Sequence, residues 1–354
     1  MDDGRGGRNQ GDAEPGVLEA VVRSDEIERL EVRGLADVRA GRPLTAGSIF
    51  YVGSIAKQFV AACVAMLEHD GDLDLGDPVA RFVPGLPAWG DRVTVRHLVH
   101  HTGGVRERSR EGPGVPIDGV PAWGNRELLE ALRAVPALDF EPGSRYGYSN
   151  RGYLLLAEVV GGASGTSLAT FAQERILRPL GMTDTSFREA PTPLPARAAR
   201  GHFEAEDGDV HVEPGRFHAV GAGGLWTTAA DLATWSANLG RDRLTGGWLS
   251  DLLVRRGALD DGTPIHYAWG LSVRTHRGLP IVSHGGNFPG WEAKMVRFPT
   301  EDLTVIVLAN RDDLDVSSSA FRLADEVLGD RLDPAAPHAD HTFDGIRSAF
   351  TDPP

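Results

Sequence analysis

The amino-acid sequence predicts an α/β (α+β) fold: an antiparallel sheet built from both chain ends and flanked by helices, with a large, mostly helical insertion. Three observations predict it. Alternating or continuous apolar segments occur early, in residues 18–40, and again late, in residues 268–310. Helical patterns dominate between them. With 354 residues, 41% of them hydrophobic, the chain can form one large globular unit or two intimately joined ones.

The strands are expected from period-two and apolar patterns. Residues 18–22 and 27–33 resemble a hairpin, and Pro299-Thr-Glu-Asp302 is typical of a second hairpin turn. The late strands are expected at 271–274, 281–283, 293–298 and 303–308. Both groups would share one sheet.

The helices are expected where apolar residues recur with helical spacing. The patterns cover residues 55–69, 94–100, 125–135, 152–160, 166–177 and 229–239, and residues 316–332 are typical of a closing helix. The expected organisation is a sheet-plus-helix subdomain of residues 17–60 and 265–332, a mostly helical subdomain of residues 61–264, a disordered segment 1–16 and an extended or disordered tail 333–354.

Lys57 is the most informative residue, because it stands in an almost wholly apolar helix one turn after Ser54. A helix that is apolar nearly all round belongs in a protein core. Residues three apart share a helix face, so the hydroxyl and the amine should meet. A buried ammonium costs several kcal/mol unless it is paired or loses its proton. A lysine that can become neutral is a base, and Ser54 beside it would be a nucleophile for acyl transfer. An exposed, solvated lysine is the alternative interpretation.

A second segment places Tyr148 and Asn150 on a loop that enters a helix, after turn-forming residues 141–145. A phenol near a protonated lysine is a candidate proton shuttle. The alternative is a tyrosine that packs at a helix entrance.

In a third segment, an apolar strand ends at His284-Gly285-Gly286-Asn287. Glycines at this point let a substrate approach the backbone closely, and a backbone N–H past Gly286 can serve as an oxyanion donor. A strand bend with a purely structural role is the alternative.

These three motifs, in this order, resemble the serine β-lactamase and penicillin-binding-protein superfamily. The Tyr-x-Asn version is similar to the class C branch, which also holds D-aminopeptidases, DD-peptidases and esterases. The resemblance runs from about residue 30 to about residue 330 and implies a β-lactamase/transpeptidase-like fold. The chain is also similar to that branch at residues 72–78, 93–104 and 221–232.

The resemblance implies specific roles. Ser54 would be acylated, Lys57 would accept its proton, and Tyr148 would return a proton to the leaving group. Asn150 would orient Lys57 and the substrate, and the backbone N–H groups of Ser54 and Asn287 would form the oxyanion hole. Whether Lys57 or Tyr148 is the base stays open, because the two should titrate as a coupled pair.

This chain departs from classical members at His284, which stands where they have the lysine of Lys-Thr-Gly. A permanent positive charge that would hold a substrate carboxylate is thereby lost at neutral pH. The exchange favours a neutral ester or amide over a β-lactam. The N-terminal helix of the family also looks absent or very short, because residues 2–16 lack apolar periodicity.

Other patterns are weaker. His100-His101 lacks the accompanying ligands of a metal site, so neither a metal nor a cofactor is expected. Gly223, with its neighbouring glycines, is expected at the lip of the cleft by resemblance, together with Gly285 and Gly286. The side chains of Trp226, Phe288 and Trp291 are expected either to line an apolar pocket or to pack in the core.

Composition narrows the partners and the location. A formal net charge of −14 argues against nucleic acid and anionic membranes. The single cysteine, Cys63, excludes an intrachain disulfide and is expected in the core. Because no apolar signal run or membrane-length stretch is visible, a cytoplasmic location is expected. The oligomeric state cannot be inferred from the sequence.

The function expected from these observations is a serine hydrolase that forms an acyl-enzyme with a small ester, amide or short peptide. Two alternatives stay open. An acyltransferase would release the acyl group to an amine or alcohol in a biosynthetic pathway, and a catalytically inactive sensor would keep the fold for ligand binding. A buried lysine beside an intact Ser54 argues against the sensor.

Overall fold

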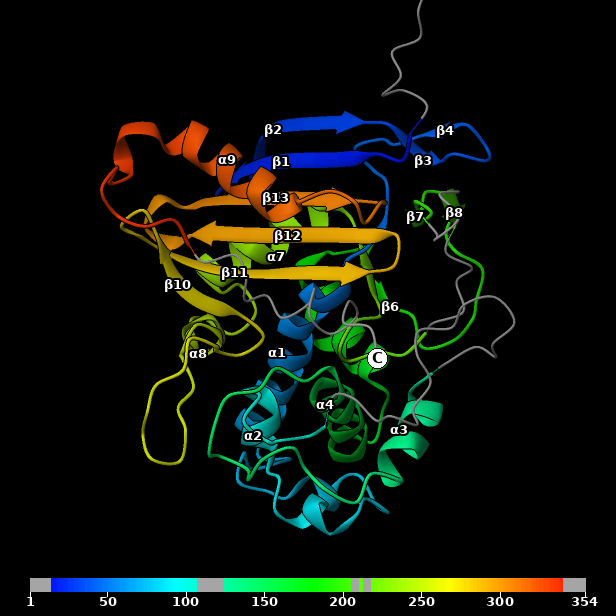
Figure 1. The fold of residues 1–354 in the computed structure, drawn as a ribbon, viewed down its shortest axis with the longest axis vertical. Coiled ribbons are helices and arrows are strands. Elements are labelled where there is room, and N and C mark those ends of the chain that lie inside the picture. Colours follow the sequence, from blue (N-terminus) through cyan, green and yellow to red (C-terminus); the bar gives the residue numbers. More distant parts are fainter. Residues whose placement is uncertain (1–13, 107–123, 205–209, 213–217, 340–354) are drawn as a thin grey trace, which may run out of the picture.

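The computed structural model describes residues 14–106, 124–204, 210–212 and 218–339. A six-stranded antiparallel sheet forms its upper layer in Figure 1, in the order β10-β11-β12-β13-β1-β2. Strand β1 from the N-terminal end pairs with β13 from the C-terminal end, with Ala20 opposite Ile306. The predicted sheet from both chain ends is confirmed. The strands are β1 Val17–Arg23, β2 Glu26–Arg33, β10 Ser272–His276, β11 Leu279–Phe288, β12 Trp291–Phe298 and β13 Leu303–Ala309.

Both faces of this sheet are covered, which explains why β13 is apolar at every position except Thr304 rather than alternating. Val305 and Val307 pack in one apolar cluster with Phe321 of helix α9 (Val316–Leu328). Ile306 and Leu308 alternate with them along the strand and belong to the larger core on the opposite face. Helix α9 crosses the outer face of the sheet, and α7 lies behind it (Figure 1).

Helix α1 (Ala56–Asp70) is the central element of the second layer. Every residue from Ala56 to Leu67 is buried, and the helix ends at Gly71, whose φ of +83° is left-handed. It packs against α4 (Asn150–Ser164). The prediction of a core helix is confirmed.

Along the chain, the remaining helices lie between the N-terminal and the C-terminal strands of the sheet. They are α2 Val95–Val99, α3 Asn125–Arg133, α5 Leu168–Ala172, α6 Arg178–Leu180, α7 Ala229–Arg241 and α8 Trp248–Leu253. The helix predicted at residues 166–177 is present as a continuous helical segment, in which α5 passes through a π-helical stretch, Gln173–Leu177, into α6.

Two observations bear on the expected subdomains, whose division stays a prediction. The boundary predicted between residues 60 and 61 falls inside α1, so that helix cannot be divided between units. The stretch expected to be mostly helical also contains strands: β6 (Ser186–Phe187) and β9 (Leu225–Thr227) form a small sheet with β5 (Phe50–Tyr51). Short hairpins are formed by β3 Leu35–Asp37 with β4 Arg42–Pro43, and by β7 His202–Glu204 with β8 Val210–Val212.

The chain ends were predicted without regular structure. Residues 1–13 and 340–354 lie outside the described residues, so most of that prediction cannot be compared. Residues 333–339 follow α9 and are held against β10: the Arg277 amide donates to the Pro337 carbonyl, and the Asp333 amide donates to the Arg277 carbonyl. This part of the predicted tail is therefore docked on the sheet.

No single helix among the described residues is long and apolar enough to cross a membrane. Helix α4 and the helical residues 168–180 are together long and apolar enough, but the two are bent by 76° relative to each other. Most of α4 is buried in the core.

Candidate functional site

The candidate nucleophile, Ser54, lies in a short 3-10 turn, Gly53–Ile55, that leads directly into α1. Gly53 has a left-handed φ of +49°, a conformation that glycine adopts without the usual steric cost. The Ser54 side chain is nearly buried, with 6% of the residue exposed, and Lys57 is fully buried. Lys57 Nζ donates a hydrogen bond of 2.8 Å to Ser54 Oγ. The predicted pairing on one helix face is present.

Lys57 Nζ has two further acceptors: Asn150 Oδ1 at 2.9 Å and the Ala222 carbonyl at 2.8 Å. An ammonium has three donors, and these three oxygens match them. After loss of one proton, the amine still donates to Asn150 and Ala222, and its lone pair accepts from the Ser54 hydroxyl. The site can therefore hold Lys57 in both protonation states with little rearrangement. This is the arrangement that proton transfer from Ser54 requires.

Tyr148 and Asn150 come from the entrance of α4, as predicted. Ser149 caps the helix, because its hydroxyl accepts from the Gly152 amide at 3.1 Å. The cap directs Asn150 toward Lys57, and the Tyr148 ring centroid lies 4.9 Å from Lys57 Nζ. Helix α1 and the entrance of α4 thus bring together side chains that are 93 residues apart.

The third motif lies on β11, which passes close to the Ser54 turn. A Cβ atom at Gly286 would stand 2.0 Å from the Val52 carbonyl oxygen and 3.1 Å from the Ser54 nitrogen. A Cβ atom at Gly53 would stand 2.9 Å from the Asn287 nitrogen. Only glycine permits this close approach of the two backbone segments, which brings the Ser54 and Asn287 amides near each other. Two such amides can act as a pair of oxyanion donors.

His284 is buried on β11, and its Nε2 lies 3.1 Å from the Tyr267 hydroxyl. Its ring centroid is 6.3 Å from that of Tyr148. The position therefore contributes a hydrogen-bonded imidazole near the Tyr148 ring.

Sequence reasoning missed the aromatic residues behind the site. Tyr153 and Tyr267 are buried, and burial raises the pKa of both phenols above the usual range, so both stay protonated. Their rings surround His101, with centroids 4.9 and 4.6 Å from its own. Tyr153 carried a usable signal, because it follows Asn150 by three residues and so shares its helix face.

The glycine-rich stretch 221–224 adds a backbone group rather than a side chain. The Ala222 carbonyl is the third acceptor for Lys57, and the Gly224 amide donates to the Tyr51 hydroxyl at 3.3 Å. A Cβ atom at Gly223 would stand 2.4 Å from that hydroxyl. Gly223 therefore lies against Tyr51, beside the carbonyl that binds Lys57.

The three aromatic residues predicted near the cleft form one cluster with Tyr51. Ring centroids of Trp226 and Trp291 are 5.3 Å apart, and Phe288 is 5.3 Å from Tyr51. Trp291 is 2% exposed and Trp226 is 8% exposed, so both are core residues. Lining of the cleft by these two residues stays a prediction. Phe288 is half-buried at the end of β11.

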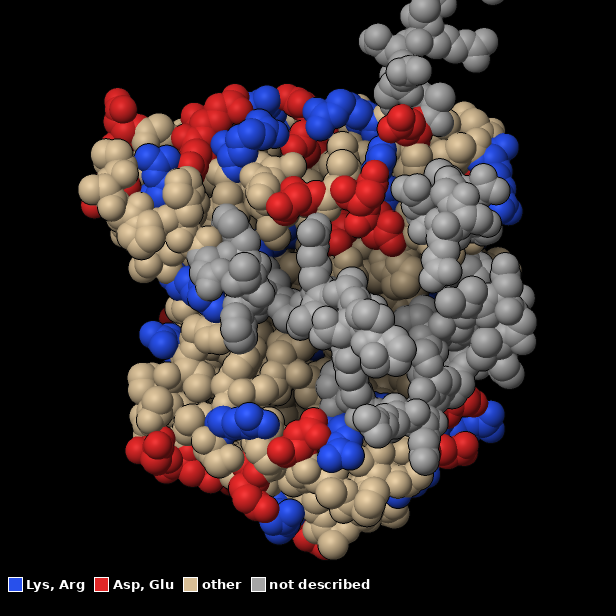
Figure 2. Space-filling model, viewed as in Figure 1, with Lys and Arg blue, Asp and Glu red and all other residues tan. Residues whose placement is uncertain are grey.

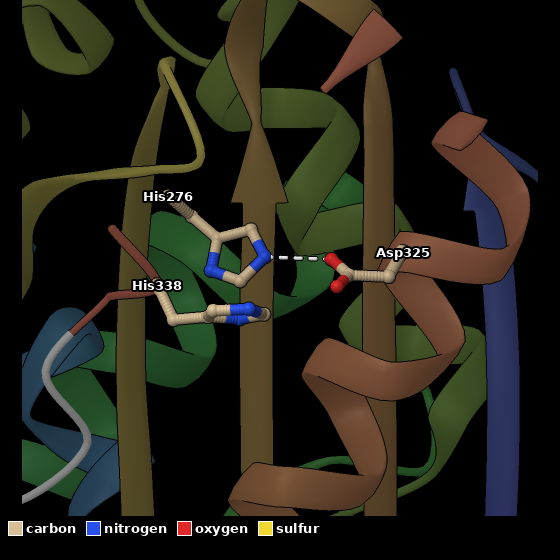
Figure 3. A group of neighbouring side chains, drawn as sticks. All are labelled: His276, Asp325 and His338. Atoms are coloured by element: carbon tan, nitrogen blue, oxygen red, sulfur yellow. Dashed lines mark hydrogen bonds and ion pairs between the residues drawn. The ribbon is translucent and has the colours of Figure 1, made fainter. Parts of the chain in front are cut away.

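A second group of ionisable residues lies far along the chain, where ligand atoms of His276, Asp325 and His338 are within 4.8 Å of one another (Figure 3). His276 Nδ1 accepts from the Ala339 amide at 3.2 Å, so the neutral ring carries its proton on Nε2, 2.7 Å from Asp325 Oδ1. A metal on Nε2 would move that proton to Nδ1, where it would face the amide donor. Arg277 also donates to Asp325 Oδ2, at 2.9 Å. These contacts favour a structural role for the group, in which it holds residues 333–339 in place, over a metal site.

Acidic and basic side chains are mixed on the face of the molecule seen in Figure 2. Among the described residues, ion pairs join acidic and basic side chains, such as Arg29 with Glu31 and Arg92 with Glu141.

Fold and site together define a serine-hydrolase-type protein with a paired serine and lysine. The Beta-lactamase family model matches residues 7–328, so the chain belongs to the Beta-lactamase family. The recognised family and fold are both confirmed.

Two curated relatives illustrate the similarity. Penicillin-binding protein 4* of Bacillus subtilis (strain 168) is 28% identical over 318 residues, which cover 83% of this chain and 68% of that protein. The D-aminopeptidase of Gluconobacter oxydans (strain 621H) is 27% identical over 301 residues, covering 84% of this chain and 56% of the relative. The chain thus spans little more than half of that D-aminopeptidase.

Solved structures support the fold. The octameric penicillin-binding protein homologue from Pyrococcus abyssi aligns with a TM-score of 0.78 at 24% identity, over 89% of this chain and 74% of that one. The D-amino acid amidase from Ochrobactrum anthropi SV3 aligns with a TM-score of 0.74 at 23% identity, over 89% of this chain and 95% of the other.

Proposed function

We propose that this protein hydrolyses a small amide or ester through an acyl-enzyme on Ser54, in the manner of the class C branch. One observation carries the proposal: fully buried Lys57 donates hydrogen bonds to Ser54 Oγ, to the Asn150 side-chain oxygen and to the Ala222 carbonyl. Burial favours the neutral form of a lysine, and a neutral amine is a base. At 2.8 Å from the Ser54 hydroxyl, this amine is in position to take its proton and make it a nucleophile.

In acylation, Ser54 Oγ attacks the substrate carbonyl carbon while its proton passes to neutral Lys57. The carbonyl oxygen becomes an oxyanion, which the Ser54 and Asn287 amides stabilise. The bond to the leaving group then breaks as Tyr148 or Lys57 donates a proton to it, and the substrate acyl group stays on Oγ. Water, deprotonated by the same pair, attacks the acyl carbon and releases the acid, and Ser54 recovers its proton.

The relatives support amide cleavage, because those named D-aminopeptidase act on amides and resemble this chain over most of its length. The His284 position supports a substrate without a carboxylate next to the scissile bond. A lysine there would offer a fixed positive charge, whereas the imidazole bonds to Tyr267. Neutral aryl esters and amino-acid amides therefore suit the site better than β-lactams.

Intact-protein mass spectrometry tests the proposal. A fluorophosphonate or an activated ester should add one phosphonyl or acyl group to the wild type and to Ser317→Ala, a control on α9 on the far side of the sheet. It should add none to Ser54→Ala. Equal labelling of Ser54→Ala would refute the assignment of the nucleophile. Adding amines to the ester reaction then distinguishes hydrolysis from acyl transfer, because only a transferase forms the amide product faster than the acid.

A further inference from the structure

His101 is a buried histidine that the proposed chemistry does not use. It is 2% exposed and has a left-handed φ of +57°, which is uncommon for a residue with a side chain. Its ring is enclosed by aromatic side chains, with the rings of Tyr146, Tyr148, Tyr153 and Tyr267 at centroid distances of 4.3 to 6.0 Å. Strained backbone and full burial at one residue call for a functional explanation.

The contacts of His101 converge on the residues that carry Tyr148. Its Nδ1 accepts from the Ser149 amide at 3.1 Å, and its backbone carbonyl accepts from the Gly147 amide at 2.8 Å. Its ring lies against the Tyr148 ring, with centroids 4.3 Å apart and planes inclined by 35°. One residue thus fixes the backbone on both sides of Tyr148 and the ring of Tyr148 itself.

The imidazole acts here without charge. Burial lowers the pKa of His101 well below its usual value, and the nearby Lys57, His284, His100 and His266 lower it further. Because Nδ1 accepts a hydrogen bond, the proton of the neutral ring is on Nε2. A protonated ring would lose the Ser149 contact and would repel the Lys57 ammonium.

We propose that His101 is a positioning residue that holds the Tyr148 ring and the Asn150 side chain against Lys57. The inference rests on the proposed function. Ser149 links the two groups, because the same residue that His101 binds caps α4 and is followed by Asn150. Displacement of a catalytic group by about 1 Å can cost about 10²-fold in rate. His101 acts through Tyr148 and Ser149, which it contacts directly.

A double-mutant cycle tests the proposal. His101→Asn keeps the left-handed backbone and a polar side chain but removes the ring, and His101→Phe keeps a ring but removes the acceptor. Each should lower kcat about 10-fold or more on an aryl ester, with a smaller change in KM. In a Tyr148→Phe background the same changes should cost less than about twofold, because their effect runs through a hydroxyl that is already absent.

His100→Asn is the matched control, since His100 is also buried but packs against Trp269 and Gly257 rather than residues 147–149. Its effect should be the same with and without Tyr148. An equal loss of kcat for His101→Asn with and without Tyr148 would overturn the positioning role. So would a kcat of His101→Asn equal to that of the wild type. If the wild type labels at Ser54, either result refutes this inference alone; failure to label refutes the proposed function.

A measurement on the unmutated protein avoids dependence on folding of the variants. In assigned nitrogen-15 spectra of histidine-labelled wild type, the His101 imidazole should be neutral and protonated on Nε2 at about pH 6.5, where a free imidazole is half protonated. A His101 that is cationic at neutral pH, or protonated on Nδ1, would overturn the proposal.

Discussion

Replacement of Lys57 by methionine tests the central inference, because it removes the amine and keeps an unbranched side chain of similar volume. If Lys57 accepts the Ser54 proton, kcat/KM should fall by about 10²- to 10⁴-fold, the usual contribution of a general base. At about 1.36 kcal/mol for each tenfold change, this range corresponds to about 2.7 to 5.4 kcal/mol of transition-state stabilisation.

The stability of Lys57→Met should move differently from its activity. The change leaves three oxygens without their donor, those of Ser54, Asn150 and Ala222, and each buried unsatisfied group costs about 1–3 kcal/mol. Against this, the desolvation penalty of the ammonium, several kcal/mol, is removed. Ser54 and Asn150 can also re-orient. The two contributions are comparable, so the free energy of unfolding should change by no more than about 2 kcal/mol.

Urea unfolding and steady-state kinetics on an aryl ester and an amino-acid amide measure both quantities. Lys57→Arg is the matched control: it keeps the charge, cannot act as a base, and should be as inactive as Lys57→Met. A kcat/KM within tenfold of wild type for Lys57→Met would refute the proton-acceptor role. A fully active Lys57→Arg would show that the cation, and not the base, is what the reaction needs.

Three further predictions follow from buried or crowded groups. Burial lowers the pKa of His100 from its usual 6.5 to about 4 and so favours the neutral ring. The contribution of this neutral ring to the free energy of unfolding is fully present above pH 6.5. It is lost as the pH falls toward 4, by about 3 kcal/mol in all. The slope of unfolding free energy against pH in that window should be shallower in His100→Gln, and an unchanged slope would contradict the assignment. Gly286→Ala should lower kcat/KM at least about 10²-fold, because its Cβ would lie 2.0 Å from the Val52 carbonyl oxygen, whereas Gly161→Ala, with its nearest atom at 3.7 Å, should be fully active. Because His284 supplies no lysine charge, kcat/KM for β-lactams should be at least tenfold below that for neutral aryl esters, and equal values would remove the argument from this residue.

The sequence predicted the Ser54 and Lys57 contact because helical spacing alone fixes it: residues three apart meet whatever surrounds them. It also predicted the two-ended sheet, because β1 and β13 carry strong apolar patterns. Both features depend on local periodicity, which a single sequence records.

Other features of the site leave no local pattern in the sequence. The Ala222 carbonyl binds Lys57, but every residue has a carbonyl, so no residue type identifies it. The Tyr267 ring reaches His101 from a loop more than 160 residues away, through packing that only the completed fold defines. The π-helical stretch Gln173–Leu177 buries the adjacent apolar residues Ile176 and Leu177, and two neighbouring apolar residues do not distinguish a π-helix from an α-helix.

The pairing of β1 with β13 has a consequence for synthesis of the chain. When residues 17–33 leave the ribosome they can form their hairpin at once, but one edge of β1 has to wait for a partner about 280 residues later. During that time a row of unbonded amides and carbonyls, flanked by Leu18, Ala20 and Val22, is open to neighbouring nascent chains. Asn287 follows Ser54 by about 230 residues, so a partly synthesised chain holds its nucleophile without the proposed oxyanion donor. Translation speed and chaperone capture over this interval, more than the strength of the finished core, should govern the yield of active protein.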